Sequence, residues 1–387
     1  MLVANILEEG VFGGPQKRVV MIAEALQSHE LTQFSNIQTA VLGPDNAKRL
    51  ITECHKKNIR YVPIKITPLS KNPKMILRYL LKFAAEVSEL TQLLKNTKPD
   101  LIHCSGGSWS IKACVAARLA NTPFIWHMND TYQPLAILVL FRALVLLLAP
   151  AGVLYSGERA KDYYEKYFPA KIPSGIARPP IDEDIRSISL NEVDRPAVYG
   201  DSTCNLVLIG NINPTKGTDL AVKAAVQLLN EGKNITLTLV GATKPTQVKY
   251  FDSVRRIAGE YFGSEIQYVE AVENVIPYFL HADVALCTSL SESGPMSAWE
   301  AAATRCPLVS ADVGDVATVL SQDGTFLFEP GQLDDLVNKL RFTIENERSR
   351  LERAQVAHKA SATLVAKGGA ENTGNLYMKV YKNHKLA

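Results

Sequence analysis

The chain has 387 residues, of which 47% are hydrophobic and 21% are charged, and its formal net charge is +3. This length suits two domains, and the composition excludes a disordered or fibrous chain. The six cysteines form no C-x-x-C pair and lie mostly in apolar runs. They are therefore predicted to be reduced, packed thiols and not a disulfide framework or a zinc site.

The small net charge conceals an asymmetry between the two halves of the chain. Residues 1–186 carry a net charge of +7, and residues 187–387 carry −4. A basic half favours an anionic partner such as a phospholipid surface, a lipid phosphate or an acidic glycan. The alternative is that these are ordinary solvated lysines, because no basic cluster is dense enough to form a patch.

The first residues are predicted to form a strand, a glycine turn and a helix. Leu2–Leu7 is an apolar run, and Gly13 and Gly14 precede a helical pattern that extends from Gln16 to about Leu26. Glycine lets a backbone approach a phosphate or a sugar closely, although a structural turn is the commoner explanation of a glycine pair. The segment lacks the basic region and cleavage site of a signal peptide, so we expect a cytoplasmic protein.

The rest of the first half alternates apolar runs with helical segments. Repeated strand–helix units predict a parallel sheet with helices on both faces. The predicted strands are Thr39–Leu42, Arg60–Pro63, Leu101–Cys104, Phe124–Trp126 and Gly152–Tyr155, and the predicted helices include Pro73–Leu94 and Glu158–Tyr167. Two histidines end such strands, and a lone histidine is more often structural than functional, which we expect of His103.

The segment Pro134–Pro150 is almost entirely apolar. It is too short to span a membrane, and Arg142 lies in its middle. We predict a core helix. The alternative is a helix whose apolar face docks on a membrane surface or on a partner subunit, because a helix that is apolar all round must be covered.

A linker and a second strand–helix series follow. Three prolines and many charges between Arg178 and Thr203 indicate the linker. The next strand is predicted at Cys204–Gly210 and the next helix at about Thr218–Asn230, with the loop NINPTKG between them. Further strands are predicted at Ile235–Gly241, Ile266–Val269 and Thr325–Phe328, and further helices at Leu333–Asn346, Arg348–Ala362 and Gly369–Leu386.

The segment Ala282–Asp315 carries the most specific pattern. Apolar runs at Asp283–Cys287 and Pro307–Ala311 enclose a Ser- and Gly-rich loop and an Ala-rich helical stretch. This is one more strand–loop–helix–strand unit. Ser291 or Ser293 is expected to cap the helix.

Two carboxylates flank the start of this helix. Glu292 lies in the loop, and Glu300 interrupts the apolar run of the helix itself. One carboxylate can therefore reach each end of a ligand whose phosphates rest on the helix N-terminus. The alternative is a pair of solvated surface acids.

The spacing of Glu292 and Glu300, with the small-residue helix and the Pro-Leu-Val-Ser-Ala-Asp-Val-Gly that follow, resembles the Glu-x7-Glu signature of the retaining glycosyltransferases of family 4. The resemblance implies the GT-B fold, an α/β architecture of two Rossmann-like domains whose parallel sheets face each other across a cleft. Residues 1–186 would bind the acceptor, residues 187–368 would bind the nucleotide sugar, and the helix 369–387 would pack back on the N-terminal domain.

The resemblance also implies roles for single residues in the second half. Glu292 would contact the donor sugar and Glu300 the ribose of the nucleotide, and the path between them would be lined by Gly294, Pro295, Met296 and Ser297. Pro295 has no amide hydrogen, so Met296 and Ser297 are the better donors.

Lys216 in the loop NINPTKG matches the family's lysine that neutralises the donor diphosphate. Asn211 stands where the family has an arginine, and asparagine can form a hydrogen bond but carries no charge.

In the first half, the resemblance places Gly13 and Gly14 next to the donor, with Lys17 and Arg18 as the basic residues that follow. His127, in FIWHMND, would meet the donor sugar close to the acceptor.

The resemblance and the residues together predict a retaining, metal-independent transferase that moves a hexosyl unit from a UDP- or GDP-sugar to a glycan or a lipid-linked acceptor of the cell envelope. His127 and Glu292 are the predicted catalytic residues. Lys216 and the helix amides would steady the leaving diphosphate, and no Asp-x-Asp motif ends a strand, so no metal or other cofactor is expected. No nucleic-acid partner is expected either.

Two alternatives stay open, a non-catalytic partner or binding subunit of the same fold and a nucleotide-sugar epimerase. Asn211 favours the first of these. The basic N-terminal half and the apolar segment Pro134–Pro150 further predict a peripheral contact of the N-terminal domain with the inner face of the membrane, if the acceptor is lipid-linked.

Overall fold

The computed structural model describes residues 1–28, 31–70, 72–131, 133–201 and 203–386. Ser202 of the predicted linker and Ala387 at the end of the predicted terminal segment lie outside the described residues. The chain divides into two compact units, unit 1 with Met1–Pro180 and Ala366–Ala387, and unit 2 with Ile181–Val365. No helix of the described residues is long and apolar enough to cross a membrane.

The crossings between the units lie at Pro180–Ile181 and at Val365–Ala366, whereas the sequence placed them at 186–187 and 368–369. The difference has a packing reason. Ile181 and Ile185 are buried in the hydrophobic core of unit 2. The backbone N–H of Ile181 donates to the carbonyl of Leu364 at 2.9 Å, which ties the two crossings together. The described residues between Arg178 and Thr203, the segment rich in proline and charge, form few regular elements beyond short 3-10 turns.

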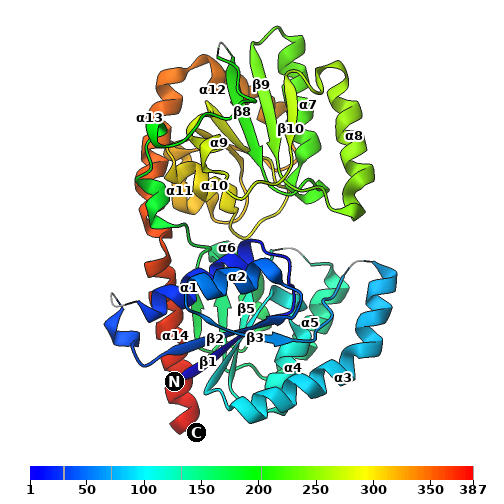
Figure 1. Ribbon diagram of the computed structural model, residues 1–387, viewed down its shortest axis with the longest axis vertical. Coiled ribbons are helices and arrows are strands. Elements are labelled where there is room, and N and C mark those ends of the chain that lie inside the picture. Colours follow the sequence, from blue (N-terminus) through cyan, green and yellow to red (C-terminus); the bar gives the residue numbers. More distant parts are fainter. Residues whose placement is uncertain (29–30, 71, 132, 202, 387) are drawn as a thin grey trace. The chain divides into compact units, whose positions relative to one another are not determined.

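Unit 1 is a parallel sheet of seven strands in the order β3-β2-β1-β4-β5-β6-β7 (Figure 1). The strands are β1 (Leu2–Leu7), β2 (Gln38–Pro44), β3 (Arg60–Ile64), β4 (Leu101–Ser105), β5 (Phe124–Met128), β6 (Gly152–Tyr155) and β7 (Ser174–Ile176). Ile6 of β1 lies opposite Leu42 of β2 and Cys104 of β4, so the chain order reverses on either side of β1. Strand β7 was not predicted, because Ser174 and Gly175 form no apolar run.

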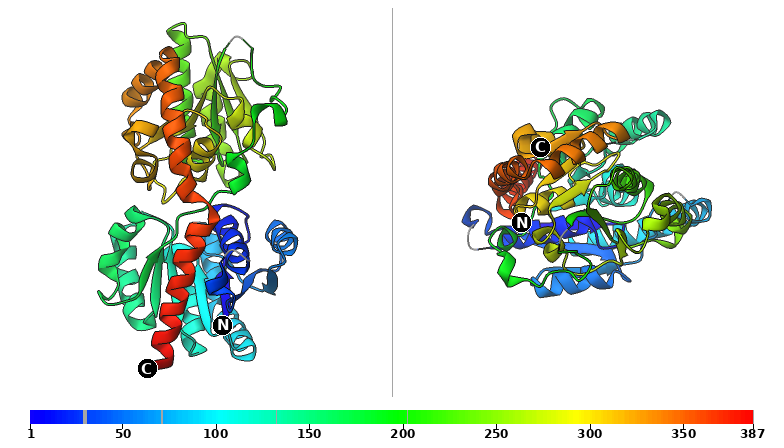
Figure 2. Two further views of the ribbon diagram at one scale, coloured as in Figure 1. Left: turned by 90° about the vertical axis from the view of Figure 1, so that its left-hand side faces the viewer. Right: turned by 90° about the horizontal axis from the view of Figure 1, so that it is seen from above.

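The helices of unit 1 form two layers. Helices α1 (Gly14–Gln27), α2 (Lys48–Lys56) and α14 (Ala366–Leu386) cover one face of the sheet, and α3 (Pro73–Thr97), α4 (Ile111–Leu119) and α5 (Leu135–Leu148) cover the other; α6 (Glu158–Tyr164) follows β6. Figure 2 shows the C-terminal helix α14 running alongside α1 and the strands of unit 1. Distant parts of the chain therefore build one layer.

The predicted helix in Pro134–Pro150 is α5, and only one of its faces is in the core. Leu138, Phe141, Val145 and Leu148 are buried, at the spacing of one helix face. The opposite face is also apolar, but it is exposed, with Leu135 and Leu147 at 76% and 72%.

Unit 2 is a parallel sheet of six strands in the order β10-β9-β8-β11-β12-β13. The strands are β8 (Cys204–Ile209), β9 (Ile235–Val240), β10 (Ile266–Val269), β11 (Val284–Cys287), β12 (Leu308–Ala311) and β13 (Phe326–Phe328). The helices are α7 (Thr218–Asn230), α8 (Val248–Ala258), α9 (Ile276–Leu280), α10 (Met296–Ala303), α11 (Val316–Gly324), α12 (Leu333–Glu345) and α13 (Glu347–Ala360). The predicted α/β architecture of two Rossmann-like units with parallel sheets is confirmed.

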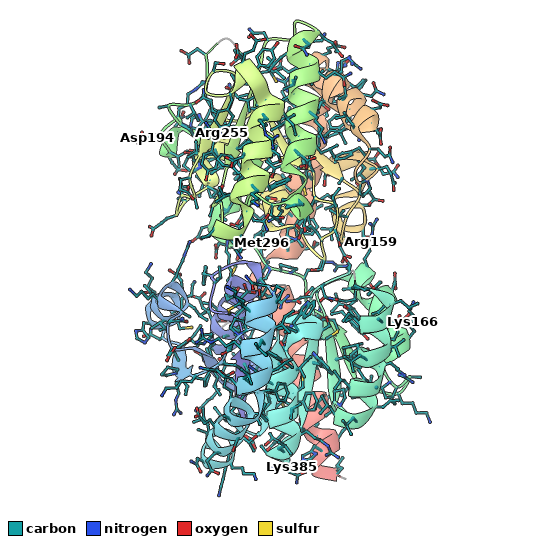
Figure 3. The ribbon with its side chains drawn as sticks, turned by 90° about the vertical axis from the view of Figure 1, so that its right-hand side faces the viewer. Arg159, Lys166, Asp194, Arg255, Met296 and Lys385 are labelled. Carbon is teal, nitrogen blue, oxygen red and sulfur yellow. The ribbon has the colours of Figure 1, made fainter. Side chains whose placement is uncertain are left out.

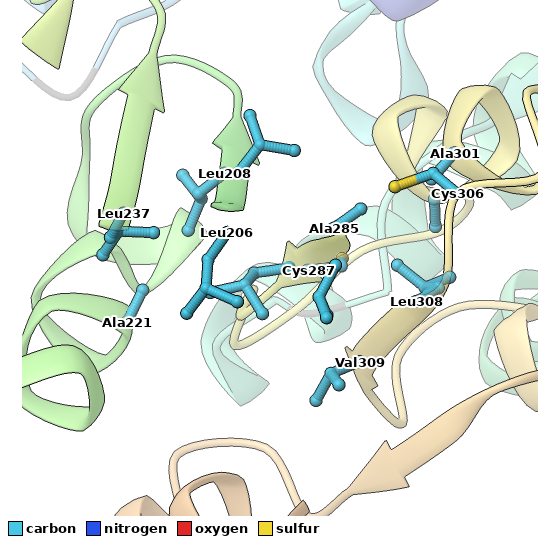
Figure 4. Packing of buried hydrophobic residues seen from close by; sticks show 14 of the residues in the cluster. Leu206, Leu208, Ala221, Leu237, Ala285, Cys287, Ala301, Cys306, Leu308 and Val309 are labelled. Atoms are coloured by element: carbon cyan, nitrogen blue, oxygen red, sulfur yellow. The ribbon is translucent and has the colours of Figure 1, made fainter. Parts of the chain in front are cut away.

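The core of unit 2 is built from the strand residues that the sequence shows as continuous apolar runs. Figure 4 shows Leu206 and Leu208 of β8, Leu237 of β9, and Leu308 and Val309 of β12 packed around the centre of the sheet. These side chains are at most 3% exposed. Strands buried on both faces read as unbroken apolar runs, which is why their positions were predictable.

Three glycines bring the loops at the carboxyl edge of this sheet into backbone contact. A Cβ on Gly241 would lie 1.9 Å from the carbonyl oxygen of Gly210, and a Cβ on Gly217 would lie 2.1 Å from that of Thr288. A Cβ on Gly314 would lie 2.8 Å from the carbonyl group of Ser293. All three glycines have positive φ. The loops after β8, β9, β11 and β12 are thus fixed to one another.

We expect Gly217→Ala to lower the free energy of unfolding clearly more than the control Gly232→Ala. Both residues have positive φ, 63° and 77°, so each alanine suffers left-handed strain of about 1–2 kcal/mol. A Cβ at position 232 meets no atom within 4 Å, whereas the one at 217 meets Thr288. Gly217→Ala should therefore lose about 1–3 kcal/mol more in urea unfolding. Equal losses would show that the contact with Thr288 relaxes without cost.

Candidate functional site

The strongest candidate site lies in unit 2, where the strand order reverses between β8 and β11. In parallel α/β sheets, ligands bind outside the carboxyl ends of the strands at such a reversal, because the neighbouring loops diverge there. The loop after β8 contains Asn211 and Lys216, and the loop after β11 contains Glu292. The topology therefore brings together residues that lie about eighty positions apart in the chain.

Hydrogen bonds fasten these two loops together. The hydroxyl of Thr288 donates to the carbonyl oxygens of Lys216 and Gly217, both at 2.9 Å. The N–H of Leu290 donates to the carbonyl of Thr215 at 2.8 Å. Within the first loop, the Asn213 side chain accepts from the N–H of Lys216 at 3.0 Å. The backbone beneath Lys216 is therefore held on both sides.

Lys216 and Glu292 form an ion pair across the two loops. Nζ of Lys216 lies 2.7 Å from Oε1 of Glu292, and the side chains remain 27% and 19% exposed. Burial acts to lower the pKa of Lys216, but the carboxylate of Glu292, with smaller contributions from Cys287 and Glu300, outweighs it and raises the pKa above its usual value. Lys216 therefore carries its charge at neutral pH, in a place that a ligand can still reach.

Helix α10 begins beside this ion pair. Its first residue is Met296, and Pro295 occupies the N-cap position at which the sequence placed Ser291 or Ser293. The first intrahelical bonds are those from Ala298 and Trp299 to the carbonyl of Pro295. The amides of Met296 and Ser297 therefore precede these bonds, where a helix presents donors to an anion. Figure 3 labels Met296 at the start of α10.

The other predicted residues of unit 2 lie around the same point. Gly294 is held by the contact of Gly314 with Ser293, and Glu300 is close enough for its charge to raise the pKa of Lys216. Asn211 is exposed on the loop of Lys216, and its carbonyl accepts from the side chain of Asn213 at 3.1 Å. The structure thus brings the predicted donor-binding residues of unit 2 into one region.

In unit 1, the predicted glycines form the start of helix α1. Gly14 is its first residue, and the N–H of Gly13 donates to the side-chain oxygen of Gln16 at 3.1 Å. The side-chain amide of Gln16 in turn donates to the carbonyl of Glu9 at 2.9 Å. The loop after β1 is therefore closed by its own side chain.

Arg18, one of the two basic residues that follow the glycine pair, lies in the interior of unit 1. Its side chain is 2% exposed, and its Nη1 donates to the hydroxyl of Ser156 at 2.6 Å. The side chain of Arg18 points into the interior of unit 1 because it lies on the same side of α1 as the buried Val19 and Ile22. Lys17, which is half-buried, is left as the basic residue nearest the glycine turn.

His127 is also fully buried. Its Nδ1 lies 2.9 Å from Nε2 of His103, and its Nε2 lies 3.2 Å from the hydroxyl of Ser156. Burial, with smaller contributions from the charges of Arg18 and His103, lowers the pKa of His127 well below its usual value. The predicted contact of His127 with a donor sugar stays a prediction, and it requires the bond to Ser156 to open.

Sequence reasoning missed Ser156 and Tyr377 as partners of the two histidines. Tyr377 lies 274 positions from His103, and Ser156 lies 29 positions from His127. No local pattern connects them, because the sheet order and the return of α14 bring them together. The described residues contain no group of three or more His, Cys, Asp or Glu that could hold a metal ion. Metal independence stays a prediction.

Comparison with known proteins connects both the fold and the site segment with glycosyltransferases. The fold is of the GT-B class. HepE of Anabaena in complex with UDP and glucose superposes with a TM-score of 0.79 at 16% identity, over 98% of this chain and 100% of that one. Sucrose-phosphate synthase of Thermosynechococcus elongatus superposes with a TM-score of 0.76 at 15% identity, over 99% and 100% of the chains.

The sequence match is concentrated in unit 2. Residues 202–360 match the family model described as glycosyl transferases group 1. The D-inositol 3-phosphate glycosyltransferase of Nocardia farcinica is 29% identical over 164 residues, 40% of this chain and 36% of the relative. The chain thus matches only about a third of that relative's length. A UDP-N-acetylglucosamine transferase of Caldicellulosiruptor saccharolyticus, named for a pyrophosphoryl-undecaprenol acceptor, is 21% identical over 73% of this chain and 72% of the relative.

Proposed function

We propose that this protein is a glycosyltransferase that takes a hexosyl unit from a nucleoside diphosphate sugar. The observation that carries the proposal is the ion pair of Lys216 and Glu292 beside the start of α10, at the point where the strand order reverses. A cation and helix amides suit a diphosphate, and a carboxylate suits sugar hydroxyls. HepE is similar in fold and binds UDP and glucose, which favours a UDP-sugar as the donor.

The ion pair suggests how the donor enters. Without a ligand, the carboxylate of Glu292 neutralises Lys216. A diphosphate bound to the α10 amides carries a larger negative charge than Glu292 and would therefore replace it as the partner of Lys216. Glu292 would then be released to accept hydrogen bonds from the sugar. Because Lys216 and Glu292 stand on two loops that are fastened together, this exchange needs only side-chain motion.

In the reaction that we propose, the bond between the anomeric carbon and the diphosphate breaks as the acceptor hydroxyl attacks. Negative charge then develops on the leaving diphosphate, and Lys216 with the amides of Met296 and Ser297 would stabilise it. The departing phosphate oxygen takes the acceptor proton on the same face, which retains the configuration without a separate base or a metal. Asn211 supplies no second cation, and this favours a binding subunit as the alternative function.

We expect Lys216→Ala to weaken binding of UDP and to lower donor turnover about 100- to 1,000-fold, the usual loss for a group that stabilises a developing oxyanion. Lys223→Ala is the matched control, because Lys223 follows in α7 and pairs with Asp219 at 2.8 Å. Calorimetry with UDP and hydrolysis of UDP-glucose measure the two effects. Unchanged kinetics of Lys216→Ala would remove this residue from the mechanism. Binding of UDP without hydrolysis or transfer by the unaltered protein would favour the binding subunit.

Replacing the two carboxylates is expected to change the affinity for UDP in opposite directions. Glu300→Gln should weaken binding of free UDP, because a ribose contact is lost. Glu292→Gln should strengthen it, because the carboxylate that competes for Lys216 is gone, while sugar transfer falls. Titration of both variants with UDP by calorimetry gives the comparison. Weaker binding in both variants would contradict the exchange of partners at Lys216.

We propose further that the acceptor carries phosphate and meets unit 1. The acceptors in the names of the two relatives are an inositol phosphate and a pyrophosphoryl lipid. The net charge of +7 over residues 1–186 suits either. A lipid-linked acceptor would bring unit 1 to the inner face of the membrane as a peripheral protein, and one surface of unit 1 suits that contact.

This surface is the outward side of α3 and α5, which lie on the same face of the sheet (Figure 1). Nine large apolar side chains are exposed on it, Ile76, Leu77, Leu80, Leu81, Leu135, Val139, Leu140, Leu146 and Leu147. Scattered single exposed apolar residues are normal, but a group of this size on two helices of one sheet face, both of which contact α4, marks an interaction surface. We call it the α3–α5 surface.

The charges of the α3–α5 surface favour an anionic membrane over a second copy of the chain. In the first half of α3, Lys74, Arg78 and Lys82 recur every four residues and form a basic stripe beside the apolar stripe of Leu77 and Leu81. Residues 73–85 and 135–148 contain four basic residues and no acidic one. Two such surfaces would repel each other, whereas anionic head groups attract each basic residue by about 1 kcal/mol.

The protein should therefore sediment with vesicles that contain phosphatidylglycerol, strongly at low salt and less at physiological salt, and not with pure phosphatidylcholine vesicles. The variant Arg78→Glu/Lys82→Glu should bind at least about twenty-five-fold more weakly, since each of the two lost charges contributes a factor of about five. Lys48→Glu/Lys382→Glu changes the net charge equally on α2 and α14, on the other face of the sheet, and should retain binding.

If both charge variants lost vesicle binding equally, the net charge of the protein would explain the binding. That result would contradict a defined binding surface on α3 and α5. Absence of binding at both salt concentrations would favour a soluble acceptor. Dimerisation without lipid that Leu77→Ser/Leu81→Ser abolishes would assign the surface to a second copy of the chain.

A further inference from the structure

A chain of hydrogen bonds crosses the interior of unit 1 from α1 to α14. Its members are Arg18, Ser156, His127, His103, Tyr377 and Asn5, and each side chain is at most 4% exposed. The successive distances are 2.6, 3.2, 2.9, 2.5 and 3.2 Å. The six residues come from α1, the end of β6, β5, β4, α14 and β1. No role of the proposed donor site explains this arrangement.

The chemistry of the two ends gives the chain one direction. Arg18 can only donate, so the hydroxyl of Ser156 accepts from it and is free to donate to Nε2 of His127. At the other end, the hydroxyl of Tyr377 donates to Oδ1 of Asn5, so it accepts from Nδ1 of His103. Between them, Nδ1–H of His127 donates to the bare Nε2 of His103. Both rings therefore carry their proton on Nδ1.

Both rings are also neutral. Burial, with a smaller contribution from the charge of Arg18, lowers the pKa of His103 to about 3. Arg18 acts on His127 in the same direction. The His103 and His127 rings stack at 5.0 Å, so a proton on either would also meet the other. A second proton on either the His103 or the His127 ring is therefore strongly disfavoured at neutral pH.

Arg18 itself is an unusual buried cation. Its Nη2 has no hydrogen-bond partner within the part of the chain that the structure describes, and burial lowers its pKa to about 9. A cavity of about 10 Å³ adjoins Arg18, Asn5, Thr39 and both histidines. This volume accommodates a single water, which Nη2 and the neighbouring polar groups would bind. An unpaired buried charge destabilises a fold, so its presence beside His127 points to a use.

We propose that Tyr377 and Arg18 are positioning residues for His127. Through the directed chain, Tyr377 fixes the proton of His127 on Nδ1, and the charge of Arg18 behind Ser156 adds to the burial that keeps the ring uncharged. Helix α14, which returns to unit 1 from the far end of the sequence, thereby determines the state of a ring on β5.

The chemical consequence rests on the proposed function. If His127 meets the donor sugar when the bond to Ser156 opens, Nε2 is the atom that becomes available, and it is a bare acceptor for a sugar hydroxyl. An imidazolium there would repel the positive charge that develops at the anomeric carbon in an oxocarbenium-like transition state. A ring held neutral avoids this repulsion.

The direct test is nitrogen NMR of the protein labelled with ¹⁵N-histidine. In the unaltered protein, His103 and His127 should both show a protonated Nδ1 and a bare Nε2. Tyr377→Phe removes the acceptor of His103, so both rings should move their proton to Nε2. The control Tyr381→Phe, one turn further along α14, should leave both rings as they were. A His127 that keeps its proton on Nδ1 in Tyr377→Phe would overturn the proposal for Tyr377.

A second variant tests Arg18 without relying on Tyr377. Arg18→Met removes the positive charge, so His127 should take up a second proton at a clearly higher pH than in the unaltered protein, whereas Arg18→Lys should restore the lower value. An unchanged titration of His127 in Arg18→Met would overturn the proposal for Arg18. Thermal unfolding of each variant establishes that unit 1 is folded.

Activity separates this proposal from the proposed function. With a nucleotide sugar as substrate, Tyr377→Phe should lower kcat about tenfold or more, as changes behind a functional residue commonly do, and leave the donor KM unchanged. A protein that transfers no sugar would contradict the proposed function while the NMR result still decides the proton positions. Changed proton positions with unchanged kcat would overturn the role of the chain in positioning.

Discussion

The candidate site of unit 2 depends on the close approach of four loop backbones at the carboxyl edge of its sheet. Gly217 and Gly314 stand where a methyl group would collide with the carbonyl of Thr288 or Ser293, and Gly241 stands against the carbonyl of Gly210. The loops of Lys216 and Glu292 can only meet because these contacts are possible. The ion pair, the start of α10 and the hydrogen bonds of Thr288 all follow from this approach. A rigid backbone with mobile charged side chains is what an exchange of Glu292 for a diphosphate requires.

Unit 1 differs from unit 2 because several of its polar candidate residues lie in the interior. Arg18, Ser156 and His127 have almost no exposed surface, so each must be satisfied by the protein. A single file of donors and acceptors from Arg18 to Asn5 does this for all of their side chains except Nη2 of Arg18, and it leaves one arrangement of protons. This arrangement buries the cation of Arg18 and holds the ring of His127 neutral in a defined tautomer. Hydrogen bonds among these six residues connect α1 and the strands β1, β4, β5 and β6 with α14. The C-terminal helix is therefore part of the core of unit 1.

The outer helices show how one segment can satisfy two interpretations. In α5, Leu138, Phe141 and Val145 enter the core, as predicted for a core helix, while the opposite face is equally apolar and exposed. The first half of α3 adds exposed leucines and a basic stripe. Apolar area next to positive charge, without acids, is the combination that a lipid surface with anionic head groups covers best.

The sequence by itself determined the α/β class, most strands and the loop of Glu292, because buried parallel strands read as apolar runs and because Lys216 and Glu292 lie in local motifs between a strand and a helix. It did not show that Arg18 and His127 are buried, that α3 carries an exposed apolar stripe, or that Tyr377 meets His103. Those facts depend on partners far away in the chain, 274 positions in the case of Tyr377 and His103. The order of the strands and the return of α14 decide them, since periodicity reports which face of an element is apolar but not what covers that face.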